Sequence, residues 1–190
     1  MGNDLGRVLT ELRQDHRNMA TMLRLLERES NRIYAGEESG FELLQDIMQY
    51  MTVFPDAVHH PKEDRLYAEL KAVRPDLSSG FARITVDHRN IAEQGMRLRD
   101  ELASIDSGNM LRRKTLVGDL LRYVNTLRSH MQWEELDLFR RIEEMIFDGH
   151  DTFDESIFPQ TADPVFGEQI EHQFGRLWKS IEQNLQQDRL

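Results

Sequence analysis

Two short stretches of the sequence contain the residue types from which a metal site can be built. In His59–Glu63 and again in His130–Glu134, a histidine is followed four residues later by a glutamate. Residues four apart lie on the same face of a helix, so the imidazole and the carboxylate can bind one metal ion, or two ions if the carboxylate bridges them. One such HxxxE motif is weak evidence because both residue types are common on helices. Two copies 71 residues apart are stronger evidence.

The repeat continues upstream of each motif. The segment Asp15-His16-Arg17-Asn18 precedes the first motif, and Asp87-His88-Arg89-Asn90 precedes the second at a spacing of 72. This order indicates a duplicated two-helix unit with one set of metal ligands in each half. The candidate metal ligands are therefore His16, His59, Glu63, His88, His130 and Glu134.

Composition limits the classes of protein that need consideration. A chain of 190 residues can form one domain with a sizeable core. Its formal charge of −10 argues against nucleic acid as a partner. The absence of cysteine excludes disulfides, zinc–thiolate sites, iron–sulfur clusters and cysteine nucleophiles. The chain has neither the apolar stretch of a signal peptide nor a run of about 20 apolar residues, so we expect a cytoplasmic protein without membrane contacts.

The elements that must position these ligands are four long helices. Apolar residues at alternating steps of three and four predict helices over residues 4–34, 41–73, 78–105 and 110–147. His16 and His88 occupy positions on the apolar stripes, and we expect them to face the core. Pro55 and Pro61 interrupt the second pattern, which predicts a kink or bulge near residues 51–57. Short turns between long helices predict an all-α, antiparallel up-down-up-down four-helix bundle over residues 1–147.

Residues 148–190 have a different composition, and we expect them to be appended to the same domain. Residues 149–164 are rich in Asp, Gly, Pro and Thr and are predicted to form a loop. A fifth helix is predicted over residues 164–187, with Pro164 in its first turn. Its apolar face can either pack on the bundle or pair with a second subunit in a homodimer, and the sequence leaves both alternatives open.

The predicted burial of six ionisable groups favours a metal over an ordinary core. Inward histidines and glutamates without partners would be costly among Leu, Ile and Met side chains, and metal ions remove that cost. Imidazole and carboxylate without thiolate suit iron, manganese or zinc. If both glutamates bridge two ions, coordination positions remain for water, dioxygen, peroxide or nitric oxide, and such nitrogen-rich redox sites favour two irons. We therefore predict a non-haem di-iron site.

The set formed by His16, His59-x-x-x-Glu63, His88 and His130-x-x-x-Glu134 resembles the hemerythrin-like, or HHE cation-binding, family over about residues 5–147. Leu66-Tyr67 and Leu138-Phe139 resemble the family's Leu-Phe continuation after each glutamate. The resemblance implies a four-helix bundle around an oxo- or hydroxo-bridged di-iron centre, with Glu63 and Glu134 as bridging ligands. It is compatible with two pairings of histidines. In one, His16 shares an iron with His130 and His59 with His88. In the other, His16 shares an iron with His59.

The sequence also differs from two kinds of family member. Oxygen-carrying members have a fifth histidine four residues after the third-helix histidine, where this chain has Ala92. Members associated with nitric-oxide stress and iron–sulfur repair have a cysteine-bearing module that this chain does not contain. Three functions therefore remain: binding or sensing of dioxygen, nitric oxide or iron, enzymatic reduction of peroxide or nitric oxide, and a structural bundle with zinc or no metal. We rank binding or sensing first and assign no catalytic residue.

Several polar residues near the motifs are expected to have other roles. His60 is offset by about 100° from His59 on a helix, so we expect it directly behind the ligands or at the rim of the site, and not as a ligand. By the same reasoning Asp15 and Asp87 are predicted to be surface charges. Asp64 is predicted to form at most a solvent-exposed pair with His60. His150 and His172 are predicted to be exposed. Packing roles are predicted for Tyr67, Tyr123 and Trp133.

Overall fold

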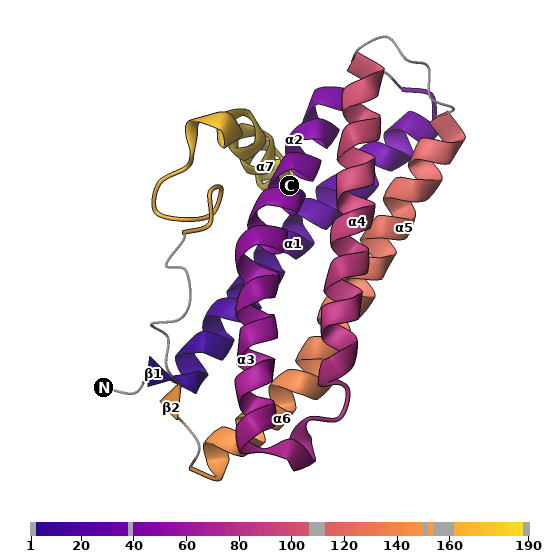
Figure 1. Cartoon of the computed structure of the whole chain (residues 1–190). Helices are drawn as coiled ribbons and strands as arrows, with labels where there is room; N and C mark the ends of the chain where they lie inside the picture. The colour runs from indigo at the N-terminus through magenta and orange to yellow at the C-terminus, as the bar shows by residue number, and fades with distance from the viewer. Residues whose placement is uncertain (1–2, 38–39, 107–112, 150–151, 154–161, 188–190) are drawn as a thin grey trace.

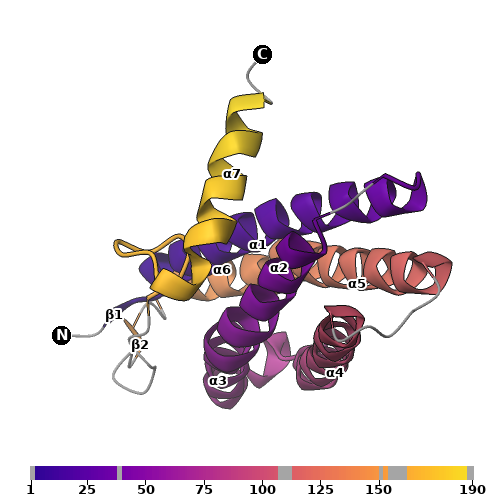
Figure 2. The same cartoon turned by 90° about the horizontal axis from the view of Figure 1, so that it is seen from above.

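The chain folds as a bundle of long helices (Figures 1 and 2). The computed structural model describes residues 3–37, 40–106, 113–149, 152–153 and 162–187. The bundle is formed by α1 (Leu5–Tyr34), α2 (Phe41–Phe54), α3 (His60–Val73), α4 (Phe81–Asp106), α5 (Arg113–Trp133) and α6 (Phe139–Phe147). Figure 1 shows that α2 and α3 continue one another, as do α5 and α6, so that four rods lie side by side. The prediction of an all-α up-down-up-down bundle is confirmed.

Each of the two composite rods contains one wider, π-helical turn. The first is η1 (Pro55–His59), where the N–H of His60 donates to the carbonyl of Pro55, five residues earlier. This turn lies where the prolines predicted a kink or bulge. Pro61 then falls in the first turn of α3, where a missing N–H costs little. The second π-helical turn, η3 (Glu134–Leu138), contains no proline and was not predicted.

The third predicted helix begins later than expected. Residues Pro75–Leu77 form a short 3-10 turn, η2, and α4 starts only at Phe81. Gly80 has a φ of +92°, a backbone conformation that glycine adopts without strain, and this ends the turn before the helix. The predicted turn around Gly108 and Asn109 lies outside the described residues.

The apolar core has two parts, with the candidate ligands between them. One cluster lies near the start of α1 and also takes in α6; it contains Leu5, Val8, Leu9, Leu12, Leu66, Tyr67, Leu70, Phe81, Ile84, Leu138, Phe139, Ile142 and Met145. The other is larger and includes Met19, Met22, Leu23, Leu26, Met48, Met51, Ile91, Leu98, Leu120, Val124 and Leu127. On α1 the first cluster ends at Leu12 and the second begins at Met19, with His16 between them. The bundle therefore encloses one polar layer between two apolar layers.

The α2 and α4 helices approach one another closely at Gly95. A Cβ atom at this position would lie 3.1 Å from the Thr52 Cγ2 atom and 3.5 Å from the Tyr123 ring. The glycine on the predicted apolar stripe therefore permits close packing of the helices.

The C-terminal segment packs on the bundle. Its helix α7 (Gly175–Gln187), preceded by the 3-10 turn η5 (His172–Phe174), is shorter than predicted. A single turn forms at Pro164, and the helix begins only at Gly175. In that turn the Asp163 Oδ1 atom accepts hydrogen bonds from the N–H groups of Val165 and Phe166. Its Oδ2 atom accepts from the Tyr50 hydroxyl at 2.9 Å, which ties the turn to α2.

The apolar face of this segment is covered by the larger core cluster. Val165, Phe174, Leu177 and Ile181 are all buried in that cluster. Figure 2 shows α7 leaving the bundle obliquely beside α1 and α2. The structure therefore has α7 packed on the bundle, which is one of the two alternatives that the sequence left open.

Two further features complete the described chain. The two-residue strands β1 (Asn3–Asp4) and β2 (Thr152–Phe153) pair antiparallel, so the chain just before α1 lies beside the chain that follows α6. None of the helices that the structure describes combines the length and the apolar character needed to span a membrane.

Candidate metal centre

All six candidate ligands meet in the polar layer of the bundle. His16 comes from α1, His88 from α4 and His130 from α5, while Glu63 lies on α3. His59 is the last residue of η1, and Glu134 is the first residue of η3. None of the six side chains is more than 5% exposed. Burial of six ionisable groups in one layer is the situation that the motif spacing predicted.

The four imidazoles surround the two carboxylates. Within the HxxxE motifs, the Nε2 atom of His59 lies 3.3 Å from Glu63, and that of His130 lies 3.4 Å from Glu134. The Nε2 atom of His16 lies 3.6 Å from Glu63 and 3.5 Å from Glu134. His88 is placed similarly, at 3.5 and 3.7 Å. These distances exceed those of N–H···O hydrogen bonds, so the groups face one another without bonding directly.

The atoms that face the centre have no hydrogen-bond partner within the described part of the chain. They include both carboxylate oxygens of Glu63, both of Glu134, and the Nε2 atoms of His16, His88 and His130. A buried polar group without a partner costs about 1–3 kcal/mol, and charged groups cost more. Seven such atoms converging on one place therefore fit a site for cations. Nitrogen and oxygen donors without sulfur suit iron, manganese or zinc.

The donor atoms fall into two overlapping groups. His16, His59 and Glu63 form one, and Glu63, His88, His130 and Glu134 form the other, with the donor atoms of each group within 4.8 Å of one another. The imidazole rings pair in the same way, since His16 and His59 have centroids 5.1 Å apart and His88 and His130 have centroids 4.8 Å apart. This arrangement favours the pairing of His16 with His59 over the pairing with His130.

The two glutamates contact both groups. Glu63 belongs to each of them. The Glu134 Oε2 atom lies 3.5 Å from His16 and 3.4 Å from His130, although these histidines belong to different groups. Taken alone, these two distances would suit the pairing of His16 with His130. A carboxylate placed between two metal positions would give the same distances, and it agrees with the ring contacts, which pair His16 with His59.

A carboxylate lies beside the outer nitrogen of each of these histidines. The Nδ1 atom lies 3.0 Å from Glu135 in His16 and 3.1 Å from Asp15 in His59. It lies 3.0 Å from Asp64 in His88 and, more distantly, 3.9 Å from Asp87 in His130. A carboxylate at Nδ1 fixes the tautomer that presents Nε2 to a metal and makes that nitrogen more basic.

These four acidic residues form a ring around the bundle, and each is the chain neighbour of a candidate ligand. Asp15, Asp64 and Glu135 contact the histidine of the next helix, namely His59, His88 and His16. Asp87 lies near His130 at 3.9 Å, where the Nδ1 atom has no hydrogen-bond partner among the described residues.

Asp15, predicted to be a surface charge, contacts His59, and Asp64, predicted to form at most a solvated pair, contacts His88. Asp87 has a surface ion pair with Arg83, as predicted, and Glu135 was not considered. The repeat in the sequence could have pointed to these residues, because Asp15 and Asp87 occupy equivalent positions, as do Asp64 and Glu135.

When no metal is bound, the charges in the layer keep some of the candidate histidine ligands protonated. Burial acts to lower the pKa of His88, but the hydrogen bond with Asp64 and the central carboxylates raise it to about 11. The pKa of His16 is likewise raised well above its usual value against the effect of burial. Burial acts to raise the pKa of Glu63, yet His59 and the other imidazoles hold it well below its usual value. The layer therefore holds imidazolium beside carboxylate, and a metal ion would replace those protons.

Of the two positions predicted for His60, the structure has the one beside the candidate ligands and not the one at the rim. It is 3% exposed, and its ring stacks on that of His88 with centroids 4.2 Å apart. Its partner at i−4 is Asp56, at 3.2 Å. Burial lowers the pKa of His60 well below its usual value, and it raises the pKa of Asp56 to about 7. The prediction of exposure is confirmed for His172, whereas His150 lies outside the described residues.

A small cavity lies between α3 and α4. It has a volume of about 170 Å³ and is lined by Asp64, Tyr67, Ala68, Lys71, Phe81, Ala82 and Thr85. Tyr67 is 2% exposed, and its hydroxyl has no hydrogen-bond partner among the described residues. Tyr67 also packs on Phe81, with ring centroids 5.0 Å apart, as predicted for a packing residue.

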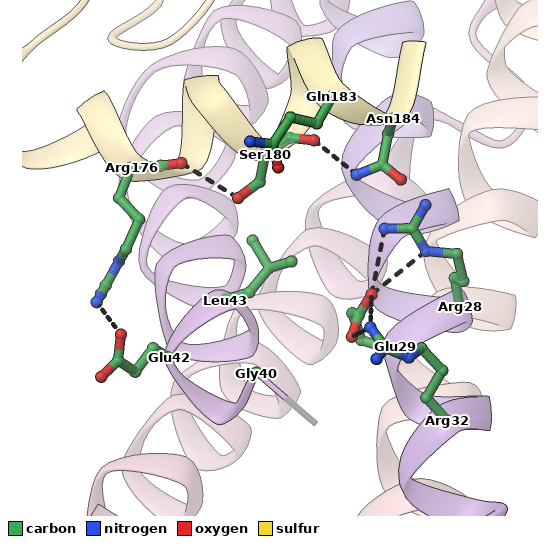
Figure 3. A pocket seen from close by; sticks show the side chains of 10 residues that line it. All are labelled: Arg28, Glu29, Arg32, Gly40, Glu42, Leu43, Arg176, Ser180, Gln183 and Asn184. Atoms are coloured by element: carbon green, nitrogen blue, oxygen red, sulfur yellow. Dashed lines mark hydrogen bonds and ion pairs between the residues drawn. The ribbon is translucent and has the colours of Figure 1, made fainter. Parts of the chain in front are cut away.

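A larger cavity of about 540 Å³ lies elsewhere, between α1, the start of α2 and α7 (Figure 3). None of its lining residues is a candidate metal ligand. Its arginines already have acidic partners, since Arg28 and Arg32 contact Glu29, and Arg176 contacts Asp46. The cavity therefore lacks a free charge that would select a ligand, and the chemistry of the chain is concentrated in the polar layer.

Comparison with known proteins agrees with the fold and the donor set. No curated protein and no solved structure has significant similarity to the chain. The profile of the hemerythrin HHE cation binding domain matches residues 7–142, which include all six candidate ligands. This match spans well over half of the sequence and ends within α6. The chain belongs to the hemerythrin HHE cation-binding domain family.

Proposed function

We propose that this protein is a non-haem di-iron protein that binds or senses a small ligand, either dioxygen, nitric oxide or iron itself. The observation that carries the proposal is the set of seven buried donor atoms that have no hydrogen-bond partner in the described ranges and that face the polar layer from all four rods of the bundle. His16, His59, Glu63, His88, His130 and Glu134 would hold two iron ions, with the glutamates between them. A cytoplasmic location and a homodimer stay predictions from the sequence.

The donor set supports iron and leaves room for a small ligand. Imidazole and carboxylate are suitable for iron, and manganese or zinc are the alternative metals. Two ions that share two bridging carboxylates and four imidazoles have coordination positions not filled by the protein. Iron at such a position supplies redox chemistry and an affinity for diatomic molecules and peroxide.

The residues of the chain supply position, charge and exclusion of water. The acidic ring of Asp15, Asp64, Asp87 and Glu135 orients the imidazoles through their Nδ1 atoms. The two apolar clusters cover the layer from both sides. A molecule must therefore be small to reach the centre. The cavity lined by Tyr67 and Asp64 lies beside the layer, since Asp64 contacts His88.

The second candidate function is a di-iron enzyme that reduces peroxide or nitric oxide. The observation in its favour is the buried Tyr67 hydroxyl, which has no partner among the described residues and can donate a proton or a hydrogen bond. Rapid oxidation of the reduced protein without turnover would support binding or sensing, whereas sustained consumption of peroxide would support the enzyme. The third hypothesis, a structural bundle without metal, leaves the unpaired donors without a role.

Substitution of the central carboxylates tests the proposal. We expect Glu63→Gln and Glu134→Gln each to lower the iron content from about two per chain to one or less, because each removes a charged ligand shared by both ions. Iron should be measured by elemental analysis after loading under anaerobic conditions. His172→Ala, a change at an exposed histidine, is the control and should leave the iron content unchanged. Full loading of both glutamine variants would contradict the assignment.

A further inference from the structure

His130 differs from the other candidate histidine ligands at its outer nitrogen. In His16, His59 and His88 the Nδ1 atom lies no more than 3.1 Å from a carboxylate oxygen. In His130 the Nδ1 atom lies 3.9 Å from the Asp87 Oδ2 atom, which is too far for a hydrogen bond, and it has no hydrogen-bond partner in the described ranges. The contact that orients the imidazole is therefore incomplete at this histidine.

The oxygen that faces His130 is held from the outside by Arg83. The Arg83 Nε atom donates a hydrogen bond of 2.9 Å to the same Asp87 Oδ2 atom. The guanidinium also lies over the ring of Trp133, with 4.6 Å between its central carbon and the ring centroid, a distance at which a cation and an aromatic ring attract one another. Arg83 is therefore held by two contacts, and it keeps Asp87 turned towards the surface.

The first half of the repeat has no cation at the position equivalent to Arg83. At the spacing of 72, Arg83 corresponds to Glu11, and Asp87 corresponds to Asp15. Like charges four residues apart on a helix repel one another, so Glu11 cannot hold Asp15 on the outside. Asp15 contacts the Nδ1 atom of His59 at 3.1 Å. Within one molecule, the outer carboxylate thus contacts its histidine where the arginine is replaced by glutamate.

We propose that Arg83 is a positioning residue that lowers the affinity of the centre for the metal ion bound by His130. It acts through Asp87, which it holds too far from the imidazole to orient it as firmly as the other carboxylates orient theirs. A carboxylate at Nδ1 fixes the tautomer and makes Nε2 more basic, so a histidine without that contact binds metal less tightly. This inference rests on the proposed two-metal function and adds an exposed residue, outside the ligand set, that sets the affinity.

Anaerobic titration with iron(II) against a competing chelator tests this in the unmodified protein and in Arg83→Gln. Loss of a carboxylate behind a metal-bound histidine weakens metal binding about 10- to 100-fold, so release of Asp87 should tighten binding of the more weakly held iron by about tenfold. The Arg83 side chain is 64% exposed, so its substitution leaves the core intact. A change that only damaged the helix would weaken binding, which is the opposite sign.

Two controls separate this contact from a general effect of charge. Arg89→Gln removes the same charge from an exposed position of α4, next to His88, and should leave the affinity unchanged. In an Asp87→Asn background, Arg83→Gln should give no gain, because the carboxylate that it releases is absent. A gain of the same size in Arg89→Gln or in the Asp87→Asn background would overturn the proposal.

The outcomes also separate this proposal from the proposed function. Two irons bound with equal affinity by Arg83→Gln and by the unmodified protein would overturn the role of Arg83 and leave the two-metal centre standing. Weaker binding in Arg83→Gln would overturn that role as well. Binding of fewer than two irons by the unmodified protein would overturn both.

Discussion

At the scale of single residues, the candidate centre has carboxylates on both sides of its imidazole rings. Glu63 and Glu134 face the imidazoles from inside, and the acidic ring holds the Nδ1 atoms from outside. Asp15 and Asp64 are the clearest members of that ring, since both lie within 3.1 Å of a ring nitrogen. Their carboxylates fix the tautomer and the orientation of His59 and His88, and they should therefore raise affinity for metal without binding it.

This predicts the result of removing these charges one at a time. Asp64→Asn and Asp15→Asn should each weaken iron binding about 10- to 100-fold, the usual effect of losing a carboxylate behind a metal-bound histidine. Anaerobic titration with iron(II) against a competing chelator measures the change. Asp100→Asn is the control, because the side chain of Asp100 is 74% exposed and lies in another part of α4. Unchanged affinity in both ring variants would show that the outer carboxylates do not orient the ligands.

The sequence was sufficient for the six inner residues but not for their neighbours. The HxxxE spacing places His59 and Glu63 on one face of any helix, whatever that helix packs against. The role of Asp64 depends on α4 lying beside α3, a tertiary contact that periodicity cannot supply. The sequence could not decide between the two positions predicted for His60, because its orientation follows from the π-helical turn and not from a regular α-helix.

At the scale of elements, the C-terminal segment is held by a buried face and one polar anchor. Leu177 of α7 is fully buried against the larger apolar cluster. Asp163 fixes the approach of the segment through Tyr50 and through Asn18, whose side-chain amide donates to it at 3.1 Å. Apolar periodicity predicted the face of the helix but not its late start at Gly175. The contacts of Asp163 with α1 and α2 are tertiary, and periodicity cannot supply them.

We predict that Leu177→Ala lowers the free energy of unfolding by about 2–5 kcal/mol, as expected for a large-to-small change at a buried site. Urea unfolding of the metal-free protein measures it. Lys179→Ala, on the exposed side of the same helix, should change the free energy by no more than about 0.5 kcal/mol. Equal stability of the two variants would indicate that α7 does not pack on the bundle in solution.

At the scale of the whole molecule, the fold is two apolar clusters with an ionisable layer between them. Such a layer weakens a core unless its charges are compensated, because buried carboxylates and imidazoles lose their hydration. Two metal ions would compensate them and connect all four rods of the bundle. The metal and the fold would then be coupled.

Metal content with an absorption spectrum, measured on protein purified from iron-supplemented cells, is the most direct test. We predict about two irons per chain. We also predict near-ultraviolet charge-transfer bands that bleach on anaerobic reduction, since bridged ferric ions absorb there and ferrous ions do not. One zinc ion per chain, or no metal after iron supplementation, would contradict the di-iron function.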